Sequence, residues 1–184
     1  MKSSSRHTNY TTRKLDPTSL AVNPTFLSLI SGVRLQVYLH RPFSQLEYSP
    51  AERLSTCAPP PCDSLIDEKL LGYTCYTAKT LRGADMGIIL FTFPGEYTKL
   101  TPLTICGLTL AILAQLAACR LILQGEQLKV AREHIRLGIG AIKAMGEVWE
   151  SAAASVRELQ TIARETLLQD SQAVQSGQCG PPPH

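Results

Sequence analysis

The feature that most constrains the fold is the run from Thr101 to Cys119, which contains no charged side chain. Such a run is just long enough to cross a lipid bilayer as a helix. Its threonines, Gln115 and the adjacent Arg120 argue against a spanning helix, and the segments that follow can cover it on several sides. We therefore expect a fully buried central helix, with a small helical membrane-associated protein that uses residues 101–119 as the alternative.

Proline-based start signals place several helices along the chain. Asn23-Pro24, Ser49-Pro50 and Thr101-Pro102 each set a capping residue before a proline that suits the first helical position. The residue before a proline is disfavoured in a helix, so the first helix is expected to end before Pro42. The predicted helices are residues 24–40, a short helix from residue 50 to the prolines at 59–61, a helix from Asp63 towards Leu90, and 102–123.

Two amphipathic helices are expected after Gly125. Apolar residues recur at steps of three or four over 126–145 and over 147–168, which is typical of helices that pack one face on a core. Trp149 is expected to be buried as an anchor between these two helices. Gly83 and Gly87, and also Gly138 and Gly140, are expected to lie at close helix crossings.

The predicted fold class is all-α, a multi-helix bundle-like domain, because no strand alternation is present beyond residues 88–93. Residues 1–22 are predicted to be a disordered basic tail or linker, and residues 23–168 the helical domain. Residues 169–184, with loop or disorder from Gln172 through Gly177, are predicted to be a disordered tail.

The sequence lacks the residue patterns of common catalytic and metal sites. It has no phosphate-binding glycine loop and no nucleophile elbow. His40 and His134 have no nearby nucleophile pattern and are interpreted as cap and surface residues. Cys57 and Cys62 are not followed by a second close pair, as a structural zinc site requires. Cys106 and Cys119 lie in the apolar run and are interpreted as small core residues. We expect no enzyme activity, no cofactor and no metal in this chain, with free thiols in a reducing compartment.

The net charge of +3 also limits the choice of partners. Lys2, Arg6, Arg13 and Lys14 precede the first acidic residue, Asp16, so the body of the chain is close to neutral. A strongly basic nucleic-acid-binding protein is therefore excluded on composition.

Several short motifs occur in a recognisable order. In chain order they are residues 38–43 (YLHRPF), 55–58 (STCA), 101–103 (TPL), 115–119 (QLAAC), 132–137 (REHIRL), 149–152 (WESA) and 162–165 (IARE), with an Ala/Gly-rich segment over 78–90. Together they resemble the C-terminal half of the regulatory domain of fungal-specific transcription factors of the zinc binuclear cluster class. The resemblance covers about residues 25–168.

The resemblance implies a non-catalytic regulatory and interaction module that controls RNA polymerase II transcription in the nucleus. The implied partners are a corepressor, a coactivator or the remaining regulatory helices, an unknown small-molecule inducer, and a second copy through self-association. The zinc of the family belongs to a separate N-terminal cluster of six cysteines that this sequence lacks, so direct sequence-specific DNA binding is not expected. The domain is expected to be a fragment.

The residues singled out from these motifs are expected to be structural. Arg41 is expected to bond the last carbonyls of the first helix, Pro42 to stop that helix, and Trp149 to anchor the last two helices. The full set is His40, Arg41, Pro42, Phe43, Cys57, Pro102, Arg132, Trp149, Ala163 and Arg164.

Overall fold

The structure, a computed structural model, describes residues 24–57, 73–92 and 100–176, with side chains described up to residue 166. These residues form five α-helices and no strand, which confirms the all-α prediction. The α-helices are α2 (Pro24–His40), α3 (Tyr73–Ile89), α4 (Pro102–Leu121), α5 (Gly125–Met145) and α6 (Glu150–Ser176). Three short 3-10 segments are η1 (Arg41–Phe43), η2 (Pro50–Leu54) and η3 (Leu90–Thr92).

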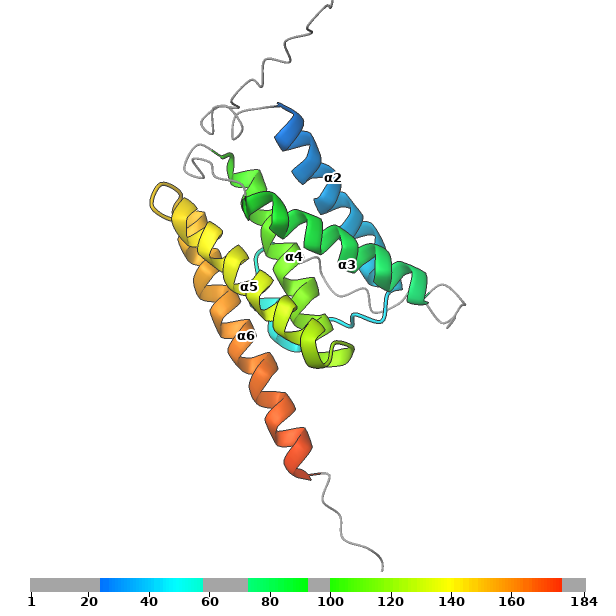
Figure 1. Cartoon of the computed structure of the whole chain (residues 1–184). Helices are drawn as coiled ribbons and strands as arrows, with labels where there is room; N and C mark the ends of the chain where they lie inside the picture. The colour runs from blue at the N-terminus through cyan, green and yellow to red at the C-terminus, as the bar shows by residue number, and fades with distance from the viewer. Residues whose placement is uncertain (1–23, 58–72, 93–99, 177–184) are drawn as a thin grey trace, which may run out of the picture.

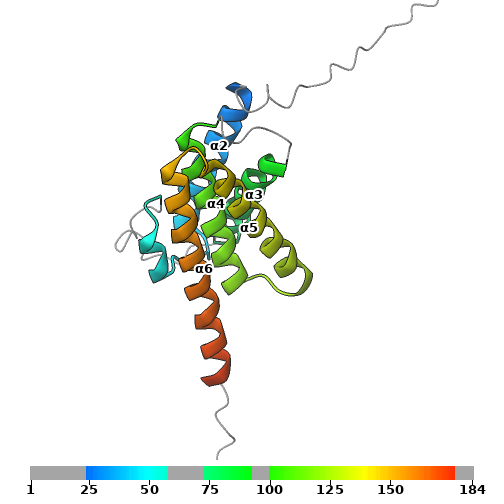
Figure 2. The ribbon, with the colours of Figure 1, turned by 90° about the vertical axis from the view of Figure 1, so that its left-hand side faces the viewer.

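Helix α4 occupies the centre of the fold. It packs against α2 and α3 on one side and against α5 and α6 on the other (Figures 1 and 2). Its buried residues include Thr104, Thr109 and Gln115 as well as the apolar side chains. The helix is long and apolar enough to cross a membrane, yet 78% of that stretch is buried inside the protein. This confirms the prediction of a buried central helix.

The predicted helix starts at Pro24, Pro50 and Pro102 are confirmed, although the Thr101 side chain makes no capping hydrogen bond. Helix α2 begins at Pro24 and ends at His40, just before Pro42, and Thr101 precedes Pro102 at the start of α4. Ser49 and Glu52 form a capping box at η2. However, η2 ends at Leu54 rather than near the prolines at 59–61, because Ser55 adopts an extended backbone. Asp63 lies outside the described residues, and α3 is described from Tyr73.

The amphipathic helices α5 and α6 turn their predicted stripes to the core, where Ile135, Ile142, Met145 and Leu159 are buried. Helix α6 extends to Ser176, beyond the predicted end at residue 168. The predicted loop from Gln172 is therefore wrong as far as Ser176. Residues 150–176 contain no glycine or proline, so no local signal ends the helix before Gly177.

Glycines allow close helix crossings at specific positions. A Cβ atom on Gly87 would lie 2.7 Å from Val33 Cγ1 of α2, and one on Gly138 would lie 2.9 Å from Ile112 Cδ1 of α4. Gly83 similarly lies against Gln36 of α2. A Cβ atom added to Gly140 would meet no atom of a neighbouring segment within 4 Å. The expectation that Gly140 also lies at a helix crossing is therefore wrong.

Candidate functional site

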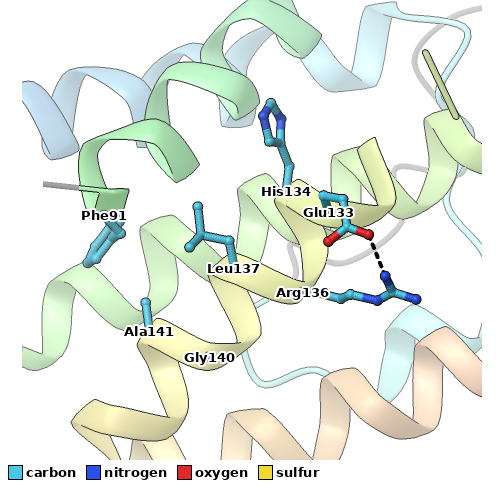
Figure 3. A pocket seen from close by; sticks show the side chains of 7 residues that line it. All are labelled: Phe91, Glu133, His134, Arg136, Leu137, Gly140 and Ala141. Carbon is cyan, nitrogen blue, oxygen red and sulfur yellow. Dashed lines mark hydrogen bonds and ion pairs between the residues drawn. The ribbon is translucent and has the colours of Figure 1, made fainter. Parts of the chain in front are cut away.

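A surface hollow lies between η3 and α5 (Figure 3). Its volume is about 630 Å³, and it is lined by Phe91, Glu133, His134, Arg136, Leu137, Gly140 and Ala141. Figure 3 shows Phe91, Leu137 and Ala141 grouped on one side, and the ion pair between Glu133 and Arg136 on the other. An apolar floor with a charged edge suits an apolar group of a ligand or of a protein partner.

A polar cluster beside this hollow joins three helices. His134 Nδ1 of α5 lies 3.0 Å from Asp85 Oδ1 of α3, and Gln115 Nε2 of α4 donates a hydrogen bond to the same oxygen at 2.6 Å. Gln115 is buried, whereas the His134 side chain is 24% exposed and that of Asp85 is 43% exposed. The interpretation of His134 as a surface residue is therefore wrong, because the ring is partly buried and paired.

A carboxylate that orients an imidazole is one component of several catalytic sites. Such a site also needs a nucleophile or a bound substrate within reach of the imidazole. None of the seven described residues that line the hollow carries a hydroxyl or a thiol. The polar groups of the lining are the Glu133 carboxylate, the His134 imidazole and the Arg136 guanidinium.

Arg41 and Glu52 form a buried ion pair. Arg41 Nη1 and Nη2 donate to the two carboxylate oxygens of Glu52, each at 2.7 Å, and the side chains are 1% and 5% exposed. The Arg41 guanidinium also lies over the Tyr48 ring, with 4.2 Å from Cζ to the ring centroid. The expectation that Arg41 bonds the last carbonyls of α2 is wrong, because Glu52 offers a bidentate charged partner.

The same end of α2 carries an aromatic cluster. The His40 ring lies 5.6 Å from the Tyr76 ring of α3, and the Phe43 ring lies 5.5 Å from it on centroid distances. His40 and Pro42 are partly buried, while Phe43 is 46% exposed. The structure thus brings His40, Arg41, Pro42 and Phe43 together at the junction of α2 and α3.

The remaining predicted residues do not join this junction. Pro102 begins α4, Arg132 and Arg164 are exposed on α5 and α6, and Ala163 packs against the core. Trp149 lies in the turn before α6 and is only partly buried, with its indole Nε1 donating to the Leu100 carbonyl at 3.1 Å. The predicted burial of Trp149 is confirmed only in part, because the side chain packs against the core but stays partly exposed.

Cys57 lies beside a residue that was expected to be a small core side chain, Cys106. Their Sγ atoms are 2.8 Å apart, and both residues are partly buried. The hydrogen bond from Cys57 lowers the pKa of Cys106 to about 6, and the same contact raises the pKa of Cys57. Among the described residues, no group of three or more His, Cys, Asp or Glu side chains could hold a metal ion.

Sequence reasoning missed Glu52, Asp85, Gln115 and Tyr76 as members of these clusters. Only Glu52 had a local signal, because it stands three residues after Ser49 as a capping box requires. The others are joined to their partners only by the tertiary fold.

Comparison with known proteins gives one informative similarity. The chain is 28% identical over 141 residues to the C6 finger domain transcription factor iacK of Pestalotiopsis fici. The match covers 76% of this chain and 20% of that protein, so the chain spans about a fifth of its length. No protein-family model and no solved structure matches the chain. The similarity supports a transcription-factor-related role for this chain.

Proposed function

We propose that this chain is a regulatory and interaction module of a fungal-specific transcription factor that controls RNA polymerase II transcription in the nucleus. The observation that carries the proposal is the similarity over 141 residues to a C6 finger domain transcription factor. The module acts by binding other proteins and performs no catalysis. Its hollow, with an apolar floor and no hydroxyl or thiol among the described lining residues, is consistent with a binding role.

The described residues do not fit the zinc cluster of the family. Cys57 and Cys106 could supply two thiolate ligands, but no third His, Cys, Asp or Glu side chain is grouped with them among the described residues. A structural zinc site needs four ligands. We therefore assign direct DNA recognition to a different segment of a full-length regulator and not to the helices described above.

The outer face of α2 is the proposed contact surface for a protein partner. Tyr38 and Leu39 follow Leu35 by three and four residues, so both lie on the same side of the helix as Leu35. The exposed fractions of Leu35, Tyr38 and Leu39 are 57%, 47% and 56%. Burying such a face against an apolar helix of the same regulator would remove a considerable apolar area from water.

A reporter assay tests the proposal. The full chain is fused to a heterologous DNA-binding domain in a fungal cell, and transcription from a promoter with matching sites is compared with the DNA-binding domain alone. We expect a severalfold change in transcription, which the double variant Leu35→Asp/Leu39→Asp abolishes. Val148→Asp is the matched control, because Val148 is also 56% exposed but lies outside α2.

The outcome is interpreted together with folding and location. A folded, nuclear fusion that leaves transcription equal to that of the DNA-binding domain alone would contradict the regulatory role. A regulatory effect that Leu35→Asp/Leu39→Asp leaves intact would reject the α2 surface while keeping the module.

Sedimentation of the purified chain tests the exposed surface directly. We expect self-association or binding of a hydrophobic dye, both reduced by Leu35→Asp/Leu39→Asp. A compact monomer of 20.1 kDa with negligible dye binding would show that the exposed face of α2 does not drive association with another protein surface.

A further inference from the structure

Two cysteines that are 49 residues apart in sequence meet in the fold. Cys57 follows η2, and Cys106 lies in the first turns of α4. Their Sγ atoms are 2.8 Å apart, within about 1 Å of the S–S bond length of about 2.0 Å in a disulfide. Both residues are partly buried rather than enclosed, so a small oxidant can reach them.

The surroundings of the pair give the two thiols different roles. The Cys57 hydrogen bond lowers the pKa of Cys106 to about 6; Arg34 acts in the same direction, while burial and Glu158 oppose the shift. Hydrogen bonding to Cys106 and burial raise the pKa of Cys57. Cys106 is therefore the member of the pair that loses its proton first, and Cys57 is the thiol that donates to it. Thiolates, and not thiols, attack peroxides and disulfides.

Short contacts hold the Cys57 segment in place. The Thr56 amide donates to Glu158 Oε2 of α6 at 3.2 Å, and the Cys57 amide donates to Ser55 Oγ at 3.3 Å. Because these contacts fix the backbone on the Cys57 side and helix α4 fixes it on the Cys106 side, the two sulfurs are held close to each other before any oxidation.

We propose that Cys57 and Cys106 form a peroxide-sensitive thiol pair that closes to a disulfide and attaches residues 55–57 covalently to α4. The Cys106 thiolate attacks one oxygen of hydrogen peroxide; an S–O bond forms, the O–O bond breaks and hydroxide leaves, which gives a sulfenic acid. The Cys57 sulfur then attacks the Cys106 sulfur, the S–S bond forms, the S–O bond breaks, and the thiol proton leaves with the departing hydroxide as water. One thiolate, one thiol and one peroxide thus become one disulfide, one water and one hydroxide, and the hydroxide takes up the proton that Cys106 released on ionising to give the second water.

The other described cysteines provide internal controls. Cys75 is exposed on α3, and Cys119 lies towards the opposite end of α4, where burial raises its pKa. Within the described part of the chain, the structure gives neither of them a contact with a second sulfur. They should therefore react with peroxide without forming a specific cross-link, and Cys119 should react slowly.

The test uses the full reduced chain treated with a small excess of hydrogen peroxide. Peptide mapping is expected to find one dominant cross-link, Cys57 to Cys106, that dithiothreitol reverses. The Tm of the oxidised protein is expected to rise, because the cross-link restricts the unfolded chain. Cys57→Ser should abolish both effects, while Cys75→Ser and Cys119→Ser should keep them.

Three outcomes would overturn the inference. A dominant cross-link between other cysteines would reject the pair, as would a stable Cys106 sulfenic acid beside a free Cys57. Equal yields of the Cys57–Cys106 cross-link in native buffer and in urea would show that the fold does not bring the thiols together. All of these are independent of whether the chain regulates transcription.

Discussion

Replacing Glu52 with glutamine perturbs the most deeply buried charge pair among the described residues. Glu52 accepts hydrogen bonds from both terminal nitrogens of Arg41 and from the Ser49 amide at 3.0 Å. The glutamine amide keeps one oxygen acceptor, but its NH₂ group cannot accept from the guanidinium. The variant therefore leaves the positive charge of Arg41 buried without a counter-ion.

The expected cost follows from the burial of both partners. With side chains only 1% and 5% exposed, water cannot replace the lost carboxylate. Removing one partner of a buried ion pair typically costs about 3–5 kcal/mol. Arg41 Nε already has no hydrogen-bond partner among the described residues, so the loss of the carboxylate would add to the unpaired donors of the guanidinium. A loss of about 3–5 kcal/mol is a large fraction of the stability of a small domain.

Urea denaturation measures this change, with Glu126→Gln as the matched control. Glu126 pairs with Lys129 at 3.0 Å, but both side chains are more than 70% exposed. An exposed pair of this spacing on a helix contributes about 0.2–0.5 kcal/mol, so the control should be close to wild type.

A second variant tests whether the unpaired charge of Arg41 causes the loss of stability. Adding Arg41→Met to Glu52→Gln removes the unpaired charge and fills a similar volume with apolar atoms, so the double variant should be more stable than Glu52→Gln alone. A loss below about 1 kcal/mol for Glu52→Gln, or a further loss on adding Arg41→Met, would refute the argument.

Three further predictions concern packing and binding. Gly138→Ala should destabilise the chain by about 1–3 kcal/mol, because its Cβ would press on Ile112, whereas Gly140→Ala should stabilise it by about 0.5–1 kcal/mol in the same urea assay. Trp149→Phe should lower the free energy of unfolding by about 1 kcal/mol through loss of the hydrogen bond to Leu100. Trp149→Ala should lower it by about 2 kcal/mol, less than the truncation of a fully buried tryptophan costs, and urea denaturation followed by circular dichroism measures both changes. The purified chain should give no footprint on DNA at physiological salt, and a specific nanomolar complex in a mobility-shift assay would contradict this.

The helices could be predicted from the sequence where their signals are local. Asn23-Pro24 and Thr101-Pro102 indicate helix starts in the local sequence, and α2 and α4 begin at Pro24 and Pro102. The end of α6 was missed because residues after 168 are merely polar, which does not stop a helix. The amphipathic stripe of α5 was predictable because a 3.6-residue period needs no knowledge of the partner.

The contacts of the candidate site could not be predicted in the same way. Asp85 and His134 are 49 residues apart, and the local sequence around either residue does not indicate that they are in contact. Cys106 was interpreted as an ordinary small core residue, since an apolar helix gives no sign of a thiol neighbour that comes from before α3. Gly140 shows the converse error: two glycines in one motif had the same local pattern, but only Gly138 faces α4.

The polar contact of Gln115 agrees with the place of α4 in the core of a helical fold. Its charge-free sequence alone fits either environment. Gln115 Nε2, however, donates to the Asp85 carboxylate, and that carboxylate is 43% exposed. A carboxylate at the level of the middle of α4 would be costly in hydrocarbon, whereas here it faces solvent and pairs with His134. Helices α2, α3, α5 and α6 pack against α4, so its apolar side chains contact other parts of the protein.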